Sequence, residues 1–326
     1  MVLRVTIDGC GGYLPELRLS NDELAALHGL ETSDAWIRER TGIRYRHVAA
    51  SGETASDMGA AAAREALSRA GVEPAEVDAI LVATSTPDSA FPATAVRIQA
   101  KLGVTKGFAF DIAAACTGFI YGLAVADSLI RTGQARCVLV IGTEVYSRIL
   151  DWADRGTCVL FGDGAGAVLL RAEEGAGTTA DRGLLSCHMH SDGRFGDILH
   201  IEGGAGSTGG PGLLRMAGKE VFRHAVTKLA AVVDEALSAN GLGHEDVRWL
   251  VPHQANLRII NAMGKKLHLP EDRVVVTVDR HANTSAASIP LALAEAHRDG
   301  RIGAGDLVVM EAIGGGLTWG AALARF

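Results

Sequence analysis

The chain has 326 residues, of which 48% are hydrophobic and 21% are charged, and its net charge is −7. This composition excludes a disordered chain, a collagen or a coiled coil, and the negative charge gives no support for nucleic-acid binding. The length predicts about two domains, or one large fused unit whose core needs no metal or disulfide to stabilise it.

The cysteines and the N-terminal sequence indicate a cytoplasmic protein. The cysteines are odd in number and include no C-x-x-C pair, which argues against a disulfide framework and against a structural zinc site. The N-terminus, MVLRVTIDGCGG, runs directly into a strand-like alternation, so no signal peptide is expected. No uncharged apolar run approaches the roughly 18 residues of a membrane span, so we expect no membrane partner either.

The first half of the chain alternates strands and helices. In chain order, the pattern predicts a strand at 3–8, helices at 20–27 and 54–70, a strand at 78–84, a helix at 93–102, a strand at 108–112, a helix at 114–132, and strands at 136–142 and 165–171. Several of these strands are apolar throughout, and the helix at 114–132 is apolar on almost every side. Such segments are typical of a covered sheet and of a central helix.

The second half repeats this plan. The pattern predicts a helix at 221–239, a strand at 247–251, a helix at 255–267, a strand at 274–278, a helix at 284–298, and strands at 306–312 and 317–325. The repeat predicts an internal duplication, with one α/β half at 1–172 and a second at 173–326. Within the second half, the run GGAGSTGGPG at 203–212 is either a surface loop or a glycine-rich flap over a ligand.

Cys116 is the first candidate for chemistry. It stands where a predicted buried strand gives way to the predicted central helix, in the run DIAAACTGF. The unpaired N–H groups and the positive end of a helix would favour a thiolate there. The alternative is a buried cysteine that packs as a small hydrophobic residue, and this is the interpretation we keep for the other four cysteines, Cys10, Cys137, Cys158 and Cys187.

His253 and Asn283 stand at two further strand-to-helix junctions, in VPHQANLRII and HANTSAAS. In the duplicated plan Asn283 takes a position near that of Cys116, so a two-fold arrangement would bring these junctions to one crevice. A lone polar residue there is more often a helix N-cap, but a thiolate beside two hydrogen-bond donors suits nucleophilic catalysis. The glycine triplet at 314–316 is either a tight hairpin turn or a place where a backbone N–H points at a ligand.

Two other motifs receive weaker interpretations. The run GDGAG at 162–166 precedes a strand instead of opening a helix, which argues against a phosphate-binding loop. Cys187, His188, His190 and Asp192 have the spacing of zinc ligands. On a strand, however, the two histidines share one face and Cys187 points away, so no metal site is expected.

The runs IAAACTGF, VPHQANLRII, HANTSAAS and GGGLTWG, in this order and spacing, closely resemble the β-ketoacyl-acyl-carrier-protein synthase III family. The resemblance extends to TSDAWIRERTGIRYRH and FGDGAGAVLL and covers essentially the whole chain. It implies a thiolase-like α/β fold of two pseudo-symmetric halves in five layers, and a homodimer. It also implies that an acyl-CoA acylates the cysteine and that malonyl-acyl carrier protein (malonyl-ACP) is then decarboxylated and condensed, without a metal or redox cofactor.

The resemblance implies residue roles as well. Cys116, His253 and Asn283 would form the catalytic triad, and the backbone N–H groups of Cys116 and Gly315 would form the oxyanion hole. The residues implied to bind CoA and its pantetheine arm are Trp36, Arg40, Thr41, Arg155 and Asn256.

The carrier protein is acidic and would dock on the helix at 255–267. Its implied contacts there are Arg258, Lys265 and Lys266, although a solvated helix face is the alternative interpretation. The acyl pocket would be bounded by Phe161, Ile313 and a Phe91 that reaches across from the partner subunit.

Three positions depart from the family pattern: Ala282 replaces an expected glycine, and Ile313 and Leu317 replace common aromatic residues. They leave the acyl-chain preference open. Two other functions also remain open: a starter-unit synthase of a polyketide pathway, and an acyltransferase that loads acyl groups without condensing them. A non-enzymatic acyl-CoA-binding module is disfavoured, because Cys116, His253 and Asn283 are all present.

Overall fold

The computed structural model describes residues 2–326 and contains two main sheets, with strand orders β1-β7-β6-β4-β5 and β11-β12-β13-β8. The strands are β1 (Val2–Tyr13), β2 (Leu17–Ser20), β3 (Tyr45–Val48), β4 (Ala79–Ala83), β5 (Phe108–Ile112), β6 (Cys137–Glu144), β7 (Gly164–Gly175), β8 (Gly183–Ser191), β9 (Leu199–Gly204), β10 (Gly210–Met216), β11 (Trp249–Pro252), β12 (Leu307–Gly314) and β13 (Thr318–Arg325). In the first sheet β4, β5 and β6 are parallel, whereas β1 and β7 pair antiparallel with each other.

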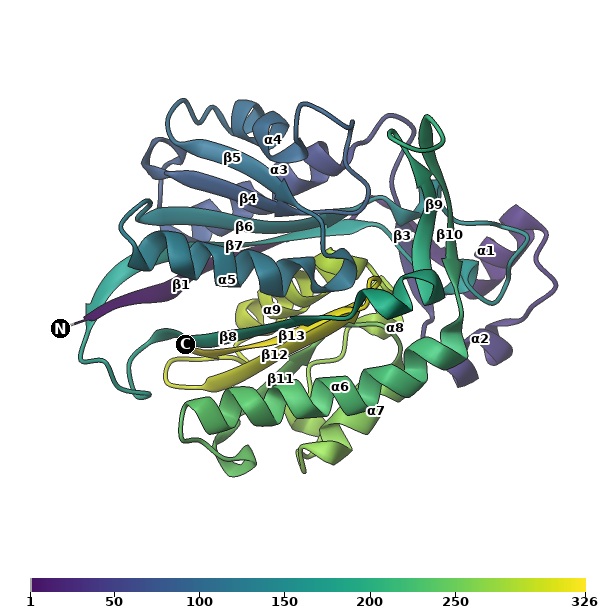
Figure 1. Cartoon of the computed structure of the whole chain (residues 1–326). Helices are drawn as coiled ribbons and strands as arrows, with labels where there is room; N and C mark the ends of the chain where they lie inside the picture. Colours follow the sequence, from purple (N-terminus) through teal and green to yellow (C-terminus); the bar gives the residue numbers. More distant parts are fainter. Residues whose placement is uncertain (1) are drawn as a thin grey trace.

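The helices flank and separate these sheets. They are α1 (Asn21–His28), α2 (Asp34–Thr41), α3 (Ala55–Ala70), α4 (Thr94–Leu102), α5 (Gly118–Arg131), α6 (Gly218–Ala239), α7 (Leu257–Lys266), α8 (Val278–His281) and α9 (Ser288–Arg298), with short 3₁₀ turns that include η2 (Ala115–Thr117), η4 (Cys158–Leu160) and η8 (Ser285–Ala287). Figure 1 shows the main elements in five layers: α3 and α4 outside the first sheet, α5 and α9 between the sheets, and α6 and α7 outside the second. This is the predicted architecture.

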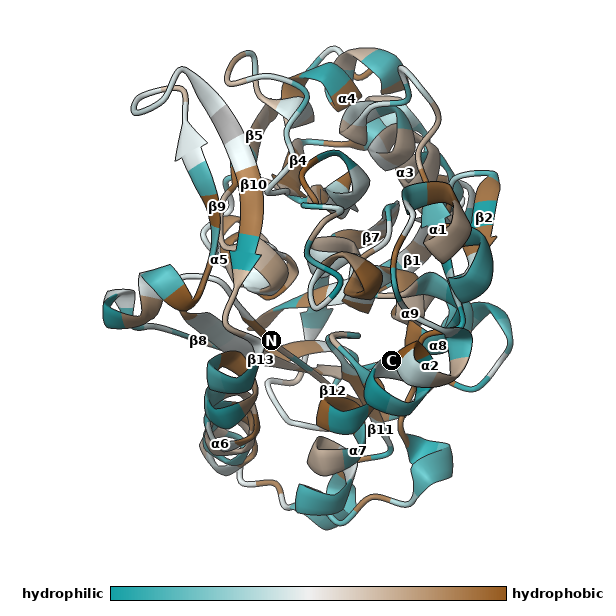
Figure 2. Cartoon of the chain, turned by 90° about the vertical axis from the view of Figure 1, so that its right-hand side faces the viewer, coloured by the Kyte–Doolittle hydropathy of each residue, from teal (hydrophilic) through white to brown (hydrophobic). Residues whose placement is uncertain are grey.

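The middle layer explains why the central helix is apolar on almost every side. Phe119, Ile120 and Leu123 of α5 are fully buried, because α5 packs against strands of both sheets. Leu293 of α9 is equally buried. Figure 2 shows the contrast with the outer layer, where α6 carries hydrophilic residues along its exposed side.

The two halves repeat the same backbone at the start of the middle helices. Ala115 (φ 46°) and Ser285 (φ 50°) both adopt the left-handed region, which is uncommon outside glycine, and each opens a 3₁₀ turn that continues into the buried helix. The structural counterpart of Cys116 is therefore Ala286. Asn283 lies upstream of that position, which refines the alignment of the halves that the sequence suggested.

The strand predicted at 274–278 is wrong. Val274 forms only an isolated bridge with Leu250, and Val278 already belongs to α8. The N–H groups of Thr277 and Val278 donate to the side chain of Gln254 and so do not take part in a strand ladder. An apolar, β-branched run is thus held out of the sheet by one buried amide.

The glycine-rich run at 203–212 forms the end of a hairpin. It includes the last residues of β9, the turn and the first residues of β10, and this hairpin stands out from the sheets in Figures 1 and 2. The chain passes from the first sheet to the second through the link at 176–182, while the division at 172/173 stays a prediction. Within residues 2–326, no helix is both long and apolar enough to cross a membrane.

Candidate active site

A cavity of about 980 Å³ opens where the two halves meet. The predicted site residues that line it are Trp36, Arg40, Thr41, Cys116, Phe161, His253, Asn256, Arg258, Asn283, Ile313 and Gly315. Residues from both ends of the sequence thus converge on one space, as the duplicated plan predicts.

Cys116 lies in η2, at the entry to α5, and is 5% exposed. Burial raises the pKa of its thiol to about 12. The expected lowering of this pKa by the helix end is therefore wrong, because the apolar surroundings penalise the thiolate more than the helix favours it. The thiol is therefore protonated at neutral pH.

His253 follows β11 directly and is held on both sides. Its backbone N–H donates to the carbonyl of Glu311 at 2.8 Å, and its Nδ1 lies 2.7 Å from the hydroxyl of Ser288. That hydroxyl also accepts the backbone N–H of Gln254 at 3.3 Å. When the hydroxyl donates to Nδ1, Nε2 carries the ring proton and can donate it to a substrate. Burial lowers the pKa of His253 to about 4, so the ring is neutral at pH 7.

Asn283 is fixed by its own backbone. Its N–H donates to Leu160 and its carbonyl accepts from Gly162, so the residue forms a bridge to the segment that follows η4. Its side-chain oxygen accepts the N–H of Ser285 at 2.9 Å. The Nδ2 group is therefore the part of the side chain that remains for a ligand.

The glycine triplet forms the tight hairpin turn that was one of the two sequence-based alternatives. It forms the hairpin turn between β12 and β13, and Gly315 and Gly316 line the cavity. A Cβ atom on Gly314 would lie 2.7 Å from the backbone nitrogen of Cys116, and one on Gly315 would lie 2.6 Å from the carbonyl oxygen of Leu199. Side chains are excluded at these two positions because the turn packs against the backbone of η2 on one side and of β9 on the other.

A cationic aromatic site forms one side of the cavity mouth. The guanidinium carbon of Arg40 lies 4.6 Å from the centre of the Trp36 ring, and that of Arg155 lies 5.2 Å from the same centre. Arg155 does not line the cavity itself; it also donates to the carbonyl of Glu31. Thr41 is buried, and its hydroxyl donates to the carbonyl of Ile37 at 2.6 Å.

The helix α7 forms the other side of the mouth. Asn256 is its N-cap, and the side-chain oxygen accepts the N–H of Ile259 at 3.1 Å. Arg258 lies over the ring of Phe222 at 5.4 Å and lines the cavity. Lys265 and Lys266 are exposed at the far end of the helix and do not reach the cavity.

The three residues expected in the acyl pocket separate into two groups. Phe161 and Ile313 line the cavity, and Phe161 stacks on Tyr146 with ring centres 4.9 Å apart. Phe91 is 85% exposed and lies outside the cavity of its own chain.

Sequence reasoning missed the hairpin as a wall of the site. Five of its residues line the cavity, namely Leu199, His200, Ile201, Leu214 and Met216, and Lys219 of α6 joins them at the mouth. The alternation of apolar and polar residues on either side of the glycine-rich run is the signal that could have revealed this hairpin.

Two buried carboxyl groups also escaped the sequence reasoning. Glu144 ends β6 and accepts the hydroxyl proton of Thr86 at 2.6 Å; burial raises its pKa to about 7. Glu311 pairs with the residue before His253, and burial raises its pKa to about 8. Both were hidden inside apolar strands.

The zinc-like motif makes protein contacts instead. His188 and His190 both contact the carboxylate of Glu235 in α6, at 2.9 and 2.7 Å, while Cys187 packs against the core on the opposite face. Among residues 2–326, no group of three or more metal-binding side chains has the geometry of a metal site.

Comparisons with known proteins agree on one family. Residues 110–193 match the model of 3-oxoacyl-[acyl-carrier-protein (ACP)] synthase III, and residues 237–326 match the model of its C-terminal part. Beta-ketoacyl-[acyl-carrier-protein] synthase III of Acidiphilium cryptum is 66% identical over 323 residues, which are 99% of each chain. The same enzyme of Rhodospirillum centenum is 62% identical over 326 residues, which are 100% of each chain.

Solved structures share the fold. The crystal structure of 3-oxoacyl-[acyl-carrier-protein] synthase III from Aquifex aeolicus superimposes with a TM-score of 0.92 at 46% identity, covering 99% of this chain and 100% of that one. A priming β-ketosynthase of the R1128 polyketide pathway superimposes with a TM-score of 0.91 at 36% identity, covering 100% of this chain and 98% of that one.

Proposed function

Because the chain belongs to the β-ketoacyl-acyl-carrier-protein synthase III family, we propose that Cys116, His253 and Asn283 share the chemistry of its reaction. The enzyme condenses an acyl-CoA primer with malonyl-ACP, releases CO₂ and initiates fatty acid biosynthesis. The observation that carries the proposal is the convergence of a cysteine, a neutral histidine and an asparagine on one cavity.

Loading comes first. The Sγ atom of Cys116 attacks the thioester carbonyl of the acyl-CoA, the bond from that carbon to the CoA sulfur breaks, and the thiol proton leaves with CoA. The N–H groups of Cys116 and Gly315 donate to the oxyanion as it forms. The N-terminal end of α5 favours negative charge on the sulfur as the proton is lost.

Condensation follows in the same cavity. Nε2–H of His253 and Nδ2–H of Asn283 donate to the thioester oxygen of malonyl-ACP. The bond to the carboxylate breaks, CO₂ leaves and the electron pair forms an enolate that these two donors stabilise. The enolate carbon attacks the acyl carbonyl on Cys116, the new carbon–carbon bond forms, and the released thiolate takes a proton from water.

The mouth binds the two carriers. We assign the adenine of CoA to Trp36 with Arg40 and Arg155, and the pantetheine arm to Thr41 and the free amide of Asn256. A ring between two flat groups needs about 7 Å at van der Waals contact, whereas Arg155 now lies 5.2 Å from the Trp36 ring. Arg155 therefore has to swing aside when the adenine enters.

The acidic carrier protein is assigned to α7. Arg258 at the cavity mouth and the exposed Lys265 and Lys266 supply positive charge on a chain whose net charge is negative. Opposite charges steer such an encounter and set its orientation. Lys219 extends the same cationic rim on α6.

The functional unit we propose is a cytoplasmic homodimer formed along β5. This strand is the edge of the first sheet, and Phe108 and Phe110 on it are each 37% exposed. Pairing of two β5 strands would cover these rings and remove an open sheet edge. Phe91, which is 85% exposed, would then reach the acyl pocket of the partner subunit. The five cysteines are free, as in a reducing compartment.

The test uses purified protein, a ladder of acyl-CoA primers and malonyl-ACP. We expect β-ketoacyl-ACP and an equal amount of CO₂ with one or more primers. Acyl-ACP without CO₂ would instead show the loading acyltransferase, and binding without turnover would show a binding module. A primer preference that excludes all short acyl groups would favour the starter-unit synthase.

A further inference from the structure

We propose that Gln254 is a positioning residue that holds Asn283 in register with His253. The inference rests on the roles proposed above for those two residues in decarboxylation. Gln254 directly follows His253 at the end of β11, and its side chain is completely buried.

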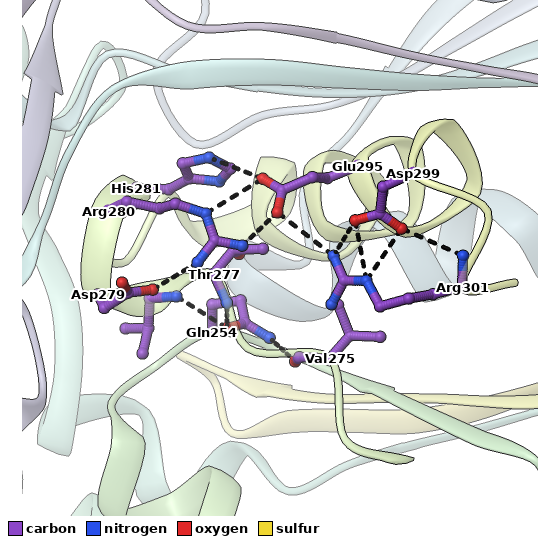
Figure 3. Close-up of polar contacts among 10 residues, drawn as sticks. Gln254, Val275, Thr277, Asp279, Arg280, His281, Glu295, Asp299 and Arg301 are labelled. Carbon is purple, nitrogen blue, oxygen red and sulfur yellow. Dashed lines mark hydrogen bonds and ion pairs between the residues drawn. The ribbon is translucent and has the colours of Figure 1, made fainter. Parts of the chain in front are cut away.

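The amide of Gln254 uses all of its hydrogen-bonding capacity on backbone groups, as Figure 3 shows in part. Its Nε2 donates to the carbonyls of Pro252 and Val275, at 2.9 and 3.0 Å. Its Oε1 accepts the N–H groups of Thr277 and Val278, at 2.8 and 3.0 Å. Two donors and two acceptor sites are all that an amide side chain has.

These contacts fix the start of α8. This helix is only four residues long, and the side chain of its N-cap residue, Thr277, makes no capping hydrogen bond. Gln254 supplies that cap from another segment, because it accepts the first N–H groups of the helix. Asn283 comes two residues after the last residue of α8, so its position depends on where α8 begins as well as on its own backbone hydrogen bonds with Leu160 and Gly162.

The far end of α8 is fixed separately. Arg280 and His281 both contact the carboxylate of Glu295 in α9, and His281 Nε2 lies 3.4 Å from it (Figure 3). The same helix α9 carries Ser288, whose hydroxyl contacts Nδ1 of His253 and accepts the backbone N–H of Gln254. The backbone of Gln254 thus joins the support of His253, and its side chain joins the support of Asn283.

Gln254 therefore bonds to two segments at once: its backbone N–H to Ser288, which supports His253, and its side chain to the start of α8. No other residue among the described residues, 2–326, makes both of these contacts. In the proposed mechanism, decarboxylation requires Nε2 of His253 and Nδ2 of Asn283 to lie at the right distance from each other, because both donate to the thioester oxygen of malonyl-ACP. A displacement of about 1 Å in a catalytic group can cost on the order of 10²-fold in rate. Loss of the Gln254 amide should therefore affect condensation while the nucleophile in η2 stays in place.

The test compares Gln254→Met, Asn283→Ala and the double variant in the full-length protein. Methionine keeps the length of the side chain and removes the four hydrogen bonds. We measure acyl-Cys116 by intact mass after acetyl-CoA treatment, and CO₂ release from labelled malonyl-ACP per loaded enzyme. Asn240→Leu is the control, because it removes an amide that donates two hydrogen bonds at the opposite end of α6 from the cavity.

We expect Gln254→Met to load Cys116 fully, to release CO₂ about 10- to 100-fold more slowly, and to keep the KM for malonyl-ACP within about twofold. In the Asn283→Ala background the same substitution should add little, because the group it positions is gone. The Asn240→Leu control should keep both half-reactions.

Three results would overturn the proposal: CO₂ release at the wild-type rate in Gln254→Met, an equal loss of loading and decarboxylation, or a full additive loss on top of Asn283→Ala. If Asn283→Ala itself decarboxylates normally, the role proposed for Asn283 fails. In that case a slow Gln254→Met with normal loading would point to His253 as the group that Gln254 positions, and the stated proposal about Asn283 would be wrong.

Discussion

The turn before α5 and the turn before α9 have the same backbone and different chemistry. Each begins with a non-glycine residue at φ 46° or 50°, runs through a 3₁₀ turn and enters a buried helix. The first turn presents Cys116 to the cavity, whereas its counterpart Ala286 is buried and does not line it. In the same register, His253 after β11 takes the position that Ala83 holds at the end of β4.

The difference indicates how one reaction is divided between the two halves in the mechanism proposed above. In that mechanism, the first half supplies the nucleophile and the second supplies the two donors. The halves are packed tightly enough to make this possible: a Cβ atom on Gly142 of β6 would lie 2.1 Å from the carbonyl oxygen of Ala286. A composite site requires that contact, since neither half contains the whole constellation.

The largest expected effect comes from removing the thiol of Cys116, or from transferring it to the equivalent position 286 in the second half. Cys116→Ser should abolish acyl-enzyme formation, because a hydroxyl is a far weaker nucleophile than a thiol and ionises less readily. Cys116→Ala combined with Ala286→Cys should stay inactive, because position 286 faces the core. Intact mass after acetyl-CoA treatment checks both. An adduct on position 286, or on another cysteine in the wild type, would contradict the division of roles.

The next effect separates the two half-reactions. Asn283→Ala should still form acyl-Cys116 but should release CO₂ from malonyl-ACP on the order of 10²- to 10³-fold more slowly, because one donor to the enolate is lost. The measurements are acyl-enzyme stoichiometry and CO₂ release. Decarboxylation at a near wild-type rate would contradict the proposed role of Asn283 as a donor to the enolate, and it would support an acyltransferase that does not condense.

The third prediction concerns pH and the residue that follows β11. Burial lowers the pKa of His253 from 6.5 to about 4. Between these values the unfolded chain binds a proton that the folded chain does not, so stability falls as the pH falls. Over this window the loss from His253 reaches up to about 3 kcal/mol. Its counterpart in the shared register of the two halves, Ala83, has no titratable side chain.

Chemical unfolding at a series of pH values checks this prediction. His253→Gln should flatten the decline between pH 6.5 and 4 relative to the wild type. Buried His281, whose pKa burial also lowers to about 4, contributes a decline in both proteins. Glu144 and Glu311, whose pKa values burial raises to about 7 and 8, contribute the opposite slope in both, so the difference between the two curves is the quantity that reports on His253. Parallel curves for the two proteins would show that His253 is not buried neutral in the fold.

The smallest effect concerns the outer helices α4 and α7. Lys101 on α4 is paired with Asp57, whereas no ion pair of Lys265 or Lys266 is found in the described part of the chain. Lys265→Glu with Lys266→Glu should raise the KM for malonyl-ACP several-fold and leave acyl-CoA loading intact. The effect should shrink with salt, since exposed charges are screened over about 8–10 Å. Lys101→Glu is the matched control and should leave the KM unchanged.

Much of this fold is encoded in local patterns that a sequence displays. Helix α3, for example, begins after Thr54, whose side chain accepts the N–H of Asp57, and ends at Gly71 with φ 63°. The candidate triad was also visible, because its three residues stand at strand-to-helix junctions and lie in motifs that resemble one family. Capping residues and sequence motifs of this kind depend on neighbouring residues only, so they can be recognised without knowledge of the tertiary packing.

What the sequence could not show depends on contacts between distant segments. Val274 to Val278 has the composition of a strand, but a buried amide takes two of its N–H groups. The pKa of Cys116 depends on how completely the second half covers it, which no local pattern records. The hairpin wall could not be predicted either, because local sequence does not show that β9 and β10 pack beside the cavity.

The contact between Gly314 and the backbone of Cys116 has a consequence for inhibitor design. Gly314 does not line the cavity itself, but any side chain there would meet the backbone nitrogen of Cys116 at 2.7 Å, so a substitution that reshapes the turn from this position also displaces Cys116. If an inhibitor binds to this turn, substitutions in the turn that weaken inhibitor binding should therefore also reduce activity. A compound that contacts Ile201 or Leu214 has no such protection, because these hairpin residues belong neither to η2 nor to the turn that packs against it.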